Sequence, residues 1–512
     1  MSAFQQLLDH SQKVSHFEHL SAIVGWDQAA VMPSGGAEAR SNAMAELSVH
    51  IHSLMTQPQL GDLFAKAEEE NLSVEQSAVL REMKRDWQQA NLLPESLVQA
   101  QSLAGSKCEH AWRTQRGNND WQGFEKNWAE VVTLSREEAQ IRAEAKGVSA
   151  YDAMLDIYEP GTTTASLDQL FSDVKTWLPS MIDQAIEKQA SGQIQLPNGH
   201  YPAEKQKALG LDVMKLLQFD FEHGRLDESV HPFCGGVPSD VRITTRYDEK
   251  EFVQSLMGIV HETGHARYEQ GLPKAFAGTS AGQARSMGIH ESQSLFFEMQ
   301  LGRSPAFVDH LAQLATNYFQ GNEFKADNLA KIYTRVEKGY IRVDADELTY
   351  PAHVILRYEI ERDLMNGVIK HTDVPELWNE KMKSYLGLST EGNYKNGCMQ
   401  DIHWTDSKRH NVTHNYKDGC MQDIHWCDGS FGYFPSYTLG AMYAAQFMAA
   451  MKKTIDVDDA IRTGDLTPIF TWLSENIWSK GSLLTTDELV RQATGETLNP
   501  AHFQSHLRNR YL

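Results

Sequence analysis

Residues Glu251 to Gly271 read EFVQSLMGIVHETGHARYEQG, and this stretch decides how the rest of the sequence is interpreted. Its centre, His261-Glu262-Thr263-Gly264-His265, is an H-E-x-x-H sequence. Residues four apart lie on the same face of an α-helix, so both imidazoles can point at one metal ion, with Glu262 beside it to activate bound water. Gly271 supplies a stop signal, and apolar residues at helical spacing precede the motif, namely Phe252, Leu256, Ile259 and Val260. The stretch predicts a metal-binding helix.

The charge balance disfavours nucleic acid and anionic membranes as partners. The chain carries 47 basic and 68 acidic residues among 512, a formal net charge of −21, whereas phosphate recognition relies on clustered Lys and Arg. The amino-terminal sequence predicts an amphipathic helix rather than an export signal, and no run approaches the roughly 18 apolar residues that cross a bilayer. The five cysteines form no C-x-x-C pair, which indicates a reducing, cytoplasmic setting.

Most of the chain has helical periodicity. Segments rich in Ala, Leu, Glu, Gln and Lys predict helices at Leu60–Glu70, Ser73–Leu92 and Trp121–Ala145. Between Gln193 and Tyr247 this period fades, and Val241–Thr245 alternates like a short strand, which predicts a small β-sheet leading into the metal helix. No linker marks a domain boundary, so we expect residues 1–512 to form a single mostly α-helical, two-lobed unit whose lobes the sequence does not separate.

A catalytic zinc ion needs a third protein ligand besides the two histidines. Glu291 follows His265 by 26 residues and lies early in the next predicted helix, where it would meet the ion if the two helices packed antiparallel across it. His290 and Glu298 are competing ligands from the same helix. With such a ligand set the ion can polarise a carbonyl, and Glu262 would take a proton from water and deliver it to the leaving amine.

Peptide hydrolysis also needs groups that stabilise the oxyanion and hold the substrate. Tyr433 and Tyr437 are four residues apart and are candidates for the oxyanion, Tyr433 ahead of Tyr437, with a role as core aromatics as the alternative interpretation. An enzyme that removes C-terminal residues needs a cation for the free carboxylate, for which the planar fork of Arg is best suited. Arg242 and Arg342 are the candidates, and for each a structural salt bridge is the alternative interpretation.

One segment of the sequence is repeated. Asn393–Asp406 reads NYKNGCMQDIHWTD and Asn415–Asp428 reads NYKDGCMQDIHWCD, so residues 393–428 contain a tandem duplication with an offset of 22 residues and identity at 12 of 14 positions. Two copies are too few for a solenoid. We expect the first copy, with His403, to be an extruded loop, since a surface loop grows at little entropic cost.

Six motifs in order resemble those of the carboxypeptidase Taq family of zinc metallocarboxypeptidases, over essentially the whole chain. They are His231-Pro232-Phe233, Asp240-x-Arg242-x-Thr244, His261-Glu262-x-x-His265, His290-Glu291-Ser292-Gln293, Ile341-Arg342-x-x-Ala345-Asp346 and Gly419-x-x-Gln422-Asp423-x-His425-Trp426. The resemblance implies a long-grooved helical fold similar to neurolysin and angiotensin-converting enzyme. It also implies one Zn²⁺ or Co²⁺ per chain, homodimers, and broad removal of single C-terminal residues from peptides.

The same resemblance implies roles for individual residues. Glu291 becomes the third metal ligand; Arg342, with the His231 and Arg242 motifs, would hold the substrate carboxylate; His425 and Tyr433 would face the oxyanion. Because the family has only one copy of the last motif, leading into the Gly-Tyr-Phe-Pro segment, its substrate-binding role is placed on the second copy, at Gln422, Asp423 and His425.

Two other functions remain as alternatives. An oligopeptidase or dipeptidyl carboxypeptidase of similar fold would share the metal site but release different products. A catalytically impaired scaffold is conceivable because of the duplication, although the intact general base Glu262 argues against it.

Overall fold

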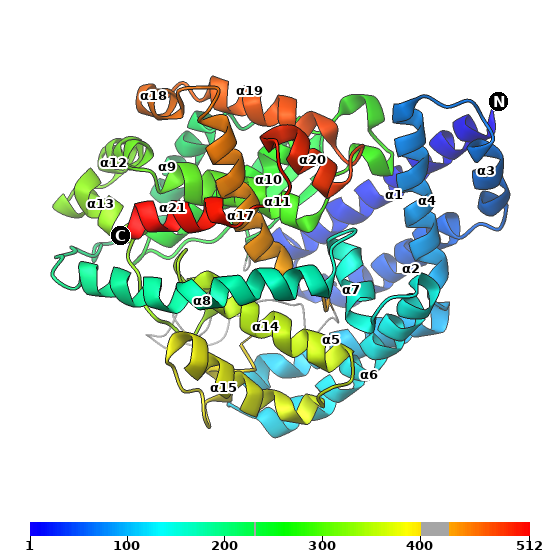
Figure 1. Ribbon diagram of the computed structural model, residues 1–512, viewed down its shortest axis with the longest axis horizontal. Helices are drawn as coiled ribbons and strands as arrows, with labels where there is room; N and C mark the ends of the chain where they lie inside the picture. The colour runs from blue at the N-terminus through cyan, green and yellow to red at the C-terminus, as the bar shows by residue number, and fades with distance from the viewer. Residues whose placement is uncertain (230–231, 401–429) are drawn as a thin grey trace. The chain divides into compact units, whose positions relative to one another are not determined.

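The computed structural model describes residues 1–229, 232–400 and 430–512 (Figure 1). The chain forms two compact units. Unit 1 comprises Met1–Asn91, Ile194–Tyr333 and Gly440–Asn499, and unit 2 comprises Leu92–Gln193, Thr334–Leu439 and Pro500–Leu512. Each unit draws on three separate segments, which explains why composition along the sequence revealed no boundary. Four predicted site residues lie outside the described residues: His231, Gln422, Asp423 and His425.

The prediction of a mostly helical protein with a small sheet is confirmed. The main helices of unit 1 are α1 (Ala3–Ala30), α2 (Ala37–Met55), α3 (Gln59–Glu68), α4 (Val74–Leu92), α9 (Ala203–Leu216), α10 (Val253–Gly271), α11 (Met287–Leu295), α12 (Pro305–Tyr318), α13 (Ala326–Tyr333), α18 (Val457–Thr463), α19 (Thr467–Asn476) and α20 (Thr486–Thr494). Those of unit 2 are α5 (Glu95–Gly117), α6 (Trp121–Lys146), α7 (Ala150–Tyr158), α8 (Thr164–Gln189), α14 (Tyr350–Met365), α15 (Val374–Leu386) and α21 (Ala501–Tyr511). α17 (Pro435–Met451) begins in unit 2 and ends in unit 1.

A three-stranded sheet precedes the metal helix, as the alternation at Val241–Thr245 predicts. Its strands are β1 (Gly224–Glu228), β2 (Cys234–Val237) and β3 (Asp240–Thr245), in the order β1-β3-β2. β3 pairs parallel with β1 and antiparallel with β2. Apolar residues of the sheet pack with α9 and α10 in one buried cluster that includes Met214, Leu226, Ile243 and Ile259. This packing holds α10 at a fixed position relative to the sheet.

Close contact between α10 and α11 brings the metal-site segments together. Gly264, in the middle of the H-E-x-x-H sequence, lies against the backbone of α11: a Cβ at this position would be 2.6 Å from the carbonyl oxygen of Gln293 and 2.7 Å from the Cα of Ser294. Such distances are far below van der Waals contact, so only glycine permits the two helices to approach this closely.

Unit 2 is built around α14, which is buried along most of its length and packs against α6, α7, α8 and α15. One buried carboxylate on this helix, that of Glu361, accepts a hydrogen bond from the hydroxyl of Tyr151 at 2.9 Å. Among the described helices of both units, none has the combination of length and apolar character that crossing a bilayer requires.

Candidate metal centre

His261, His265 and Glu291 form a three-residue cluster whose potential ligand atoms all lie within 4.8 Å of one another. The two Nε2 atoms, of His261 and His265, lie 3.9 and 3.8 Å from the same oxygen, Oε2 of Glu291. Two atoms that share a tetrahedral zinc ion are about 3.4 Å apart, so a small adjustment lets all three side chains contact one ion. The cluster lies entirely in unit 1, and the residues present fit a divalent metal.

The π-helical segment Phe296–Gly302, which continues α11, supplies a partner for His261. The Nδ1 atom of His261 lies 2.9 Å from Oε2 of Glu298, whose other oxygen accepts a hydrogen bond from Nη2 of Arg303 at 2.7 Å. Burial opposes protonation of His261, but Glu298 prevails and raises the pKa of the imidazole to about 9. Glu298 therefore orients His261 so that Nε2 faces Glu291, and it does not join the cluster itself.

His290 supports the second histidine in the same way. Its Nδ1 lies 2.6 Å from Nδ1 of His265, and its Nε2 lies 2.8 Å from Oε1 of Glu269. If His265 offers Nε2 to a metal, its Nδ1–H must donate to His290, whose own proton then points at Glu269. Burial, with His290 and His261 nearby, lowers the pKa of His265 well below its usual value, which favours the neutral ring that a metal requires.

Glu262 lies beside the cluster and has no fixed partner. Its side chain is buried, with 8% of its surface exposed, and no hydrogen bond or ion pair joins its carboxylate to another described residue. Burial raises the pKa of Glu262 to about 7, with His261 acting against the rise and the Glu291 charge adding to it. A carboxylate that titrates near neutral pH suits a group that must both accept and release a proton.

The predicted substrate residue Arg342 lies in unit 2, in the short helix η6 (Arg342–Asp344), and is buried. Its guanidinium carbon lies 4.6 Å from the ring centre of Tyr437 and 5.2 Å from that of Tyr350, and Nη1 donates to the Tyr350 hydroxyl. Aromatic rings thus hold the cation in a fixed orientation. Tyr433, just before α17, contacts Tyr437 with ring centres 5.2 Å apart.

Arg242, in β3 of unit 1, forms an ion pair within its own strand. Its Nε and Nη2 atoms lie 2.5 and 2.9 Å from the two carboxylate oxygens of Asp240, and its guanidinium stacks over the ring of Trp26 at 4.7 Å. His19 also contacts Asp240, at 3.3 Å. The salt bridge foreseen as the alternative is present, and a substrate role for Arg242 stays a prediction.

The first copy of the duplication differs from expectation. Its residues Asn393–Gln400 are not extruded: Cys398, Met399 and Gln400 are buried within unit 2. The extruded-loop prediction is therefore wrong for these residues, because groups of unit 2 bind them: Gln400, for example, accepts a hydrogen bond from the main-chain N–H of Arg342 at 3.1 Å. The remainder of both copies lies outside the described residues.

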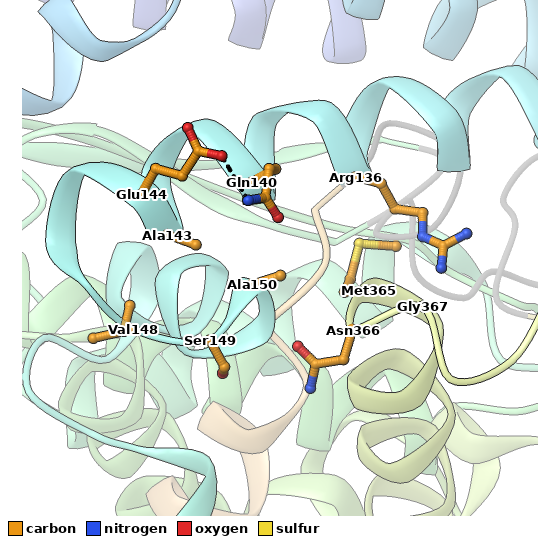
Figure 2. A pocket seen from close by; sticks show the side chains of 10 residues that line it. All are labelled: Arg136, Gln140, Ala143, Glu144, Val148, Ser149, Ala150, Met365, Asn366 and Gly367. Atoms are coloured by element: carbon orange, nitrogen blue, oxygen red, sulfur yellow. Dashed lines mark hydrogen bonds between the residues drawn. The ribbon is translucent and has the colours of Figure 1, made fainter.

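An open pocket of about 550 Å³ in unit 2 contains none of the predicted site residues. It lies between α6, the start of α7 and the end of α14, and Figure 2 shows Arg136 at one end and Glu144 at the other. Among the described residues, the predicted metal ligands His261, His265 and Glu291 lie instead on α10 and α11.

Two supporting residues, Glu269 and Arg303, were not foreseen. Glu269 lies four residues after His265 on the same helix, so helical spacing carried a signal for it. Arg303 follows the π-helical segment. Because a π-helical turn contains about one more residue than an α-helical turn, it changes the direction of the side chains that follow, and α-helical spacing does not predict that direction.

A mostly helical fold with an H-E-x-x-H helix, a facing carboxylate and a buried free glutamate defines a metallopeptidase-type site. A family model described as carboxypeptidase Taq (M32) metallopeptidase matches residues 6–408 and 411–511. The chain belongs to this family, and metal-dependent carboxypeptidase function follows from that membership. Each copy of the duplication falls in one of the two matched segments.

Several relatives extend over the whole chain. "Carboxypeptidase 1" of Bacillus subtilis is 33% identical and covers 99% of this chain and 97% of its own length. "Thermostable carboxypeptidase 1" of Thermus thermophilus is 34% identical, and the match covers 100% of this chain and 98% of the relative's length. Among solved structures, Trypanosoma cruzi metallocarboxypeptidase 1 is 47% identical with a TM-score of 0.93 and covers 99% of both chains.

Proposed function

We propose that this chain is a zinc-dependent carboxypeptidase that releases single C-terminal residues from peptides, with His261, His265 and Glu291 as the metal ligands. The observation that carries the proposal is the convergence of both Nε2 atoms on one oxygen of Glu291. Two imidazoles and one carboxylate are a ligand set typical of catalytic zinc, and Co²⁺ suits the same donors. When bound, the metal polarises the scissile carbonyl and lowers the pKa of water.

Glu262 is the general base in this proposal. It takes the proton from the attacking water and passes it to the leaving amine, which requires a carboxylate that no other side chain occupies. Its pKa of about 7 lets it carry out both transfers near neutral pH. Glu298 and the His290–Glu269 pair keep the two imidazoles in the tautomer that exposes Nε2.

The peptide would be held by main-chain and charge interactions. β2 is an edge strand of the described sheet and packs against α10, so an extended peptide can add along it. Arg342 would bind the C-terminal carboxylate, together with Arg242 and His231, and Tyr433 and His425 would stabilise the oxyanion. Gln422 and Asp423, supported by the resemblance of their motif, belong to the proposed substrate-binding set. Tyr437 completes it, supported by its spacing from Tyr433 and by its contact with the Arg342 guanidinium at 4.6 Å.

The setting proposed for the enzyme is cytoplasmic, as a homodimer. Cys234, which lies in β2, is a free thiol, which agrees with a reducing compartment. Dimerisation is supported by the family resemblance alone, and light scattering of the purified protein tests it directly.

A timed digest of a defined peptide, read by mass spectrometry with and without chelator, tests the activity. The proposal expects loss of one C-terminal residue at a time, abolished by chelator and restored by zinc. Internal cuts would point to an oligopeptidase and dipeptide steps to a dipeptidyl carboxypeptidase. A scaffold would leave the peptide intact under all conditions.

A further inference from the structure

Unit 2 contains a binding surface for the duplicated segment, which we call the repeat slot and define by Trp112, Arg116, Asn119, Tyr340 and Arg342. Residues Tyr394–Gln400 of the first copy occupy it. Gln400, fully buried, accepts a hydrogen bond from the main-chain N–H of Arg342 at 3.1 Å and donates to the carbonyl oxygen of Tyr340 at 2.8 Å. The slot thus recognises a glutamine at this position through backbone groups.

Three further contacts of the repeat slot are made to the main chain of its occupant. Nε1 of Trp112 donates to the carbonyl oxygen of Met399 at 3.0 Å. Asn119 accepts from the main-chain N–H of Lys395 at 2.9 Å, and Nε of Arg116 donates to the carbonyl oxygen of Lys395 at 3.2 Å. Contacts of this kind depend on backbone conformation and do not distinguish between identical sequences.

The second copy offers the same groups in the same order. Tyr416–Gln422 reads YKDGCMQ where Tyr394–Gln400 reads YKNGCMQ. The equivalents of Lys395, Met399 and Gln400 are Lys417, Met421 and Gln422, so every hydrogen bond described above has a donor or acceptor in the second copy.

We infer that the repeat slot binds either copy, so that the protein exchanges between two registers offset by 22 residues. When one copy replaces the other, the chain on one side of the slot gains the 22 residues that the opposite side loses. Because loop-closure entropy depends only weakly on loop length, neither register is strongly favoured by the connecting chain.

Within Tyr394–Gln400 the copies differ at one position, Asn396 against Asp418, and this difference sets the preference. Oδ1 of Asn396 is buried without a hydrogen-bond partner, and Asp418 would place a carboxylate oxygen there. Removing a charged oxygen from water without a partner is costly, so the first copy is the major occupant of the slot and the second the minor one. This inference goes beyond the proposed function, which places Arg342 and Gln422 in the substrate-binding set. Its own support is the sequence identity and the contacts within unit 2, and its test measures thiol protection rather than activity.

Alkylation of Cys398 and Cys420, quantified by mass spectrometry over time, tests the exchange. Docked Cys398 is 2% exposed, so docking protects its thiol. Gln400→Ala weakens the first copy and is expected to speed alkylation of Cys398 roughly tenfold, by loss of a buried hydrogen-bonding group, while slowing that of Cys420. Gln422→Ala, the matched variant, is expected to slow the alkylation of Cys398 further and to speed the alkylation of Cys420. Independent responses of the two thiols would overturn the inference.

Two deletions cover the case in which a substitution disturbs folding. Removing residues 401–422 leaves the first copy alone, and removing residues 394–415 leaves the second alone. The first deletion should protect Cys398 from alkylation, and the second should protect Cys420 to a similar extent. A freely reactive Cys420 in the second deletion would show that the slot rejects the second copy. Protection of Cys420 that rises with protein concentration would place it in a neighbouring molecule's slot and also overturn the inference.

Discussion

Gly440, in α17, lies against Glu291: a Cβ at position 440 would be 2.6 Å from the Cβ of Glu291 and 3.0 Å from its carbonyl carbon. The proposed carboxylate ligand therefore keeps its place only because the neighbouring helix has no side chain there. Gly440→Ala is expected to push Glu291 away from the two histidines, lowering zinc affinity by roughly tenfold or more and stability by about 1–3 kcal/mol from overpacking. A zinc titration against a competing chelator measures the first effect, and urea unfolding the second.

Gly258→Ala is the matched control for that change. Gly258 lies in α10, and a Cβ there would have no atom within 4 Å. Alanine in a helix interior is favoured over glycine by about 0.5–1 kcal/mol, so the control should be slightly more stable with unchanged zinc affinity. Equal losses of zinc affinity in both variants would contradict the steric account of Gly440.

Glu262→Gln tests the role of the general base independently of metal binding. Since the amide cannot accept a proton, kcat should fall by about 10²–10⁴-fold, while zinc affinity stays near that of the wild type. Steady-state kinetics on a short peptide, with zinc content determined on the same samples, gives both quantities. A variant that keeps most of its activity would remove Glu262 from the proposed role.

Glu298→Gln tests the support of His261. The amide removes the charge that faces Nδ1 at 2.9 Å, and loss of such an outer partner lowers metal affinity by about 10–100-fold. Glu187→Gln, an exposed position on α8, serves as the control and should leave zinc affinity unchanged. If both variants bind zinc like the wild type, Glu298 does not position the ligand.

Glu18 and Asp86 give the stability of unit 1 a pH dependence. Both line a cavity of about 70 Å³; burial and the Asp86 charge raise the pKa of Glu18, and burial raises the pKa of Asp86 against a hydrogen bond from Ser280. A carboxyl with a raised pKa binds its proton more tightly in the folded chain, so the free energy of unfolding falls as pH rises from the ordinary carboxyl pKa through the raised one.

Glu18→Gln removes one of these charges. The variant should unfold at higher urea concentration than the wild type at pH 7, by roughly 1 kcal/mol or less. The difference should disappear near pH 3, roughly one unit below the ordinary carboxyl pKa, where Glu18 is protonated in both states. A stabilisation of equal size at both pH values would assign the effect to packing and not to charge.

The sequence was sufficient to predict the metal helix, because its apolar spacing and its two histidines are both local patterns. The helices at Leu60–Glu70 and Ser73–Leu92 appear as α3 and α4 with boundaries shifted by at most two residues. The strand at Val241–Thr245 was likewise predictable from alternation. Local periodicity carries this information irrespective of what the segment later packs against.

Sequence spacing alone did not determine which of Glu291, His290 and Glu298 lies closest to the two histidines as a third metal ligand. The three residues lie on one segment, and which of them meets the histidines depends on the approach of α11 at Gly264 and on the π-helical turn that follows. The first duplicated copy was misjudged for a related reason. Identical sequences carry no local signal of which one a distant surface selects, so the burial of Gln400 required the tertiary structure.

The central claim is that His261, His265 and Glu291 together hold one zinc ion. Its most direct test is the zinc content per chain of wild type and Glu291→Gln after equilibration with limiting zinc and a competing chelator, read by elemental mass spectrometry. The account predicts one zinc per wild-type chain and little or none in the variant, with both proteins folded. Equal zinc content in the two proteins would contradict it.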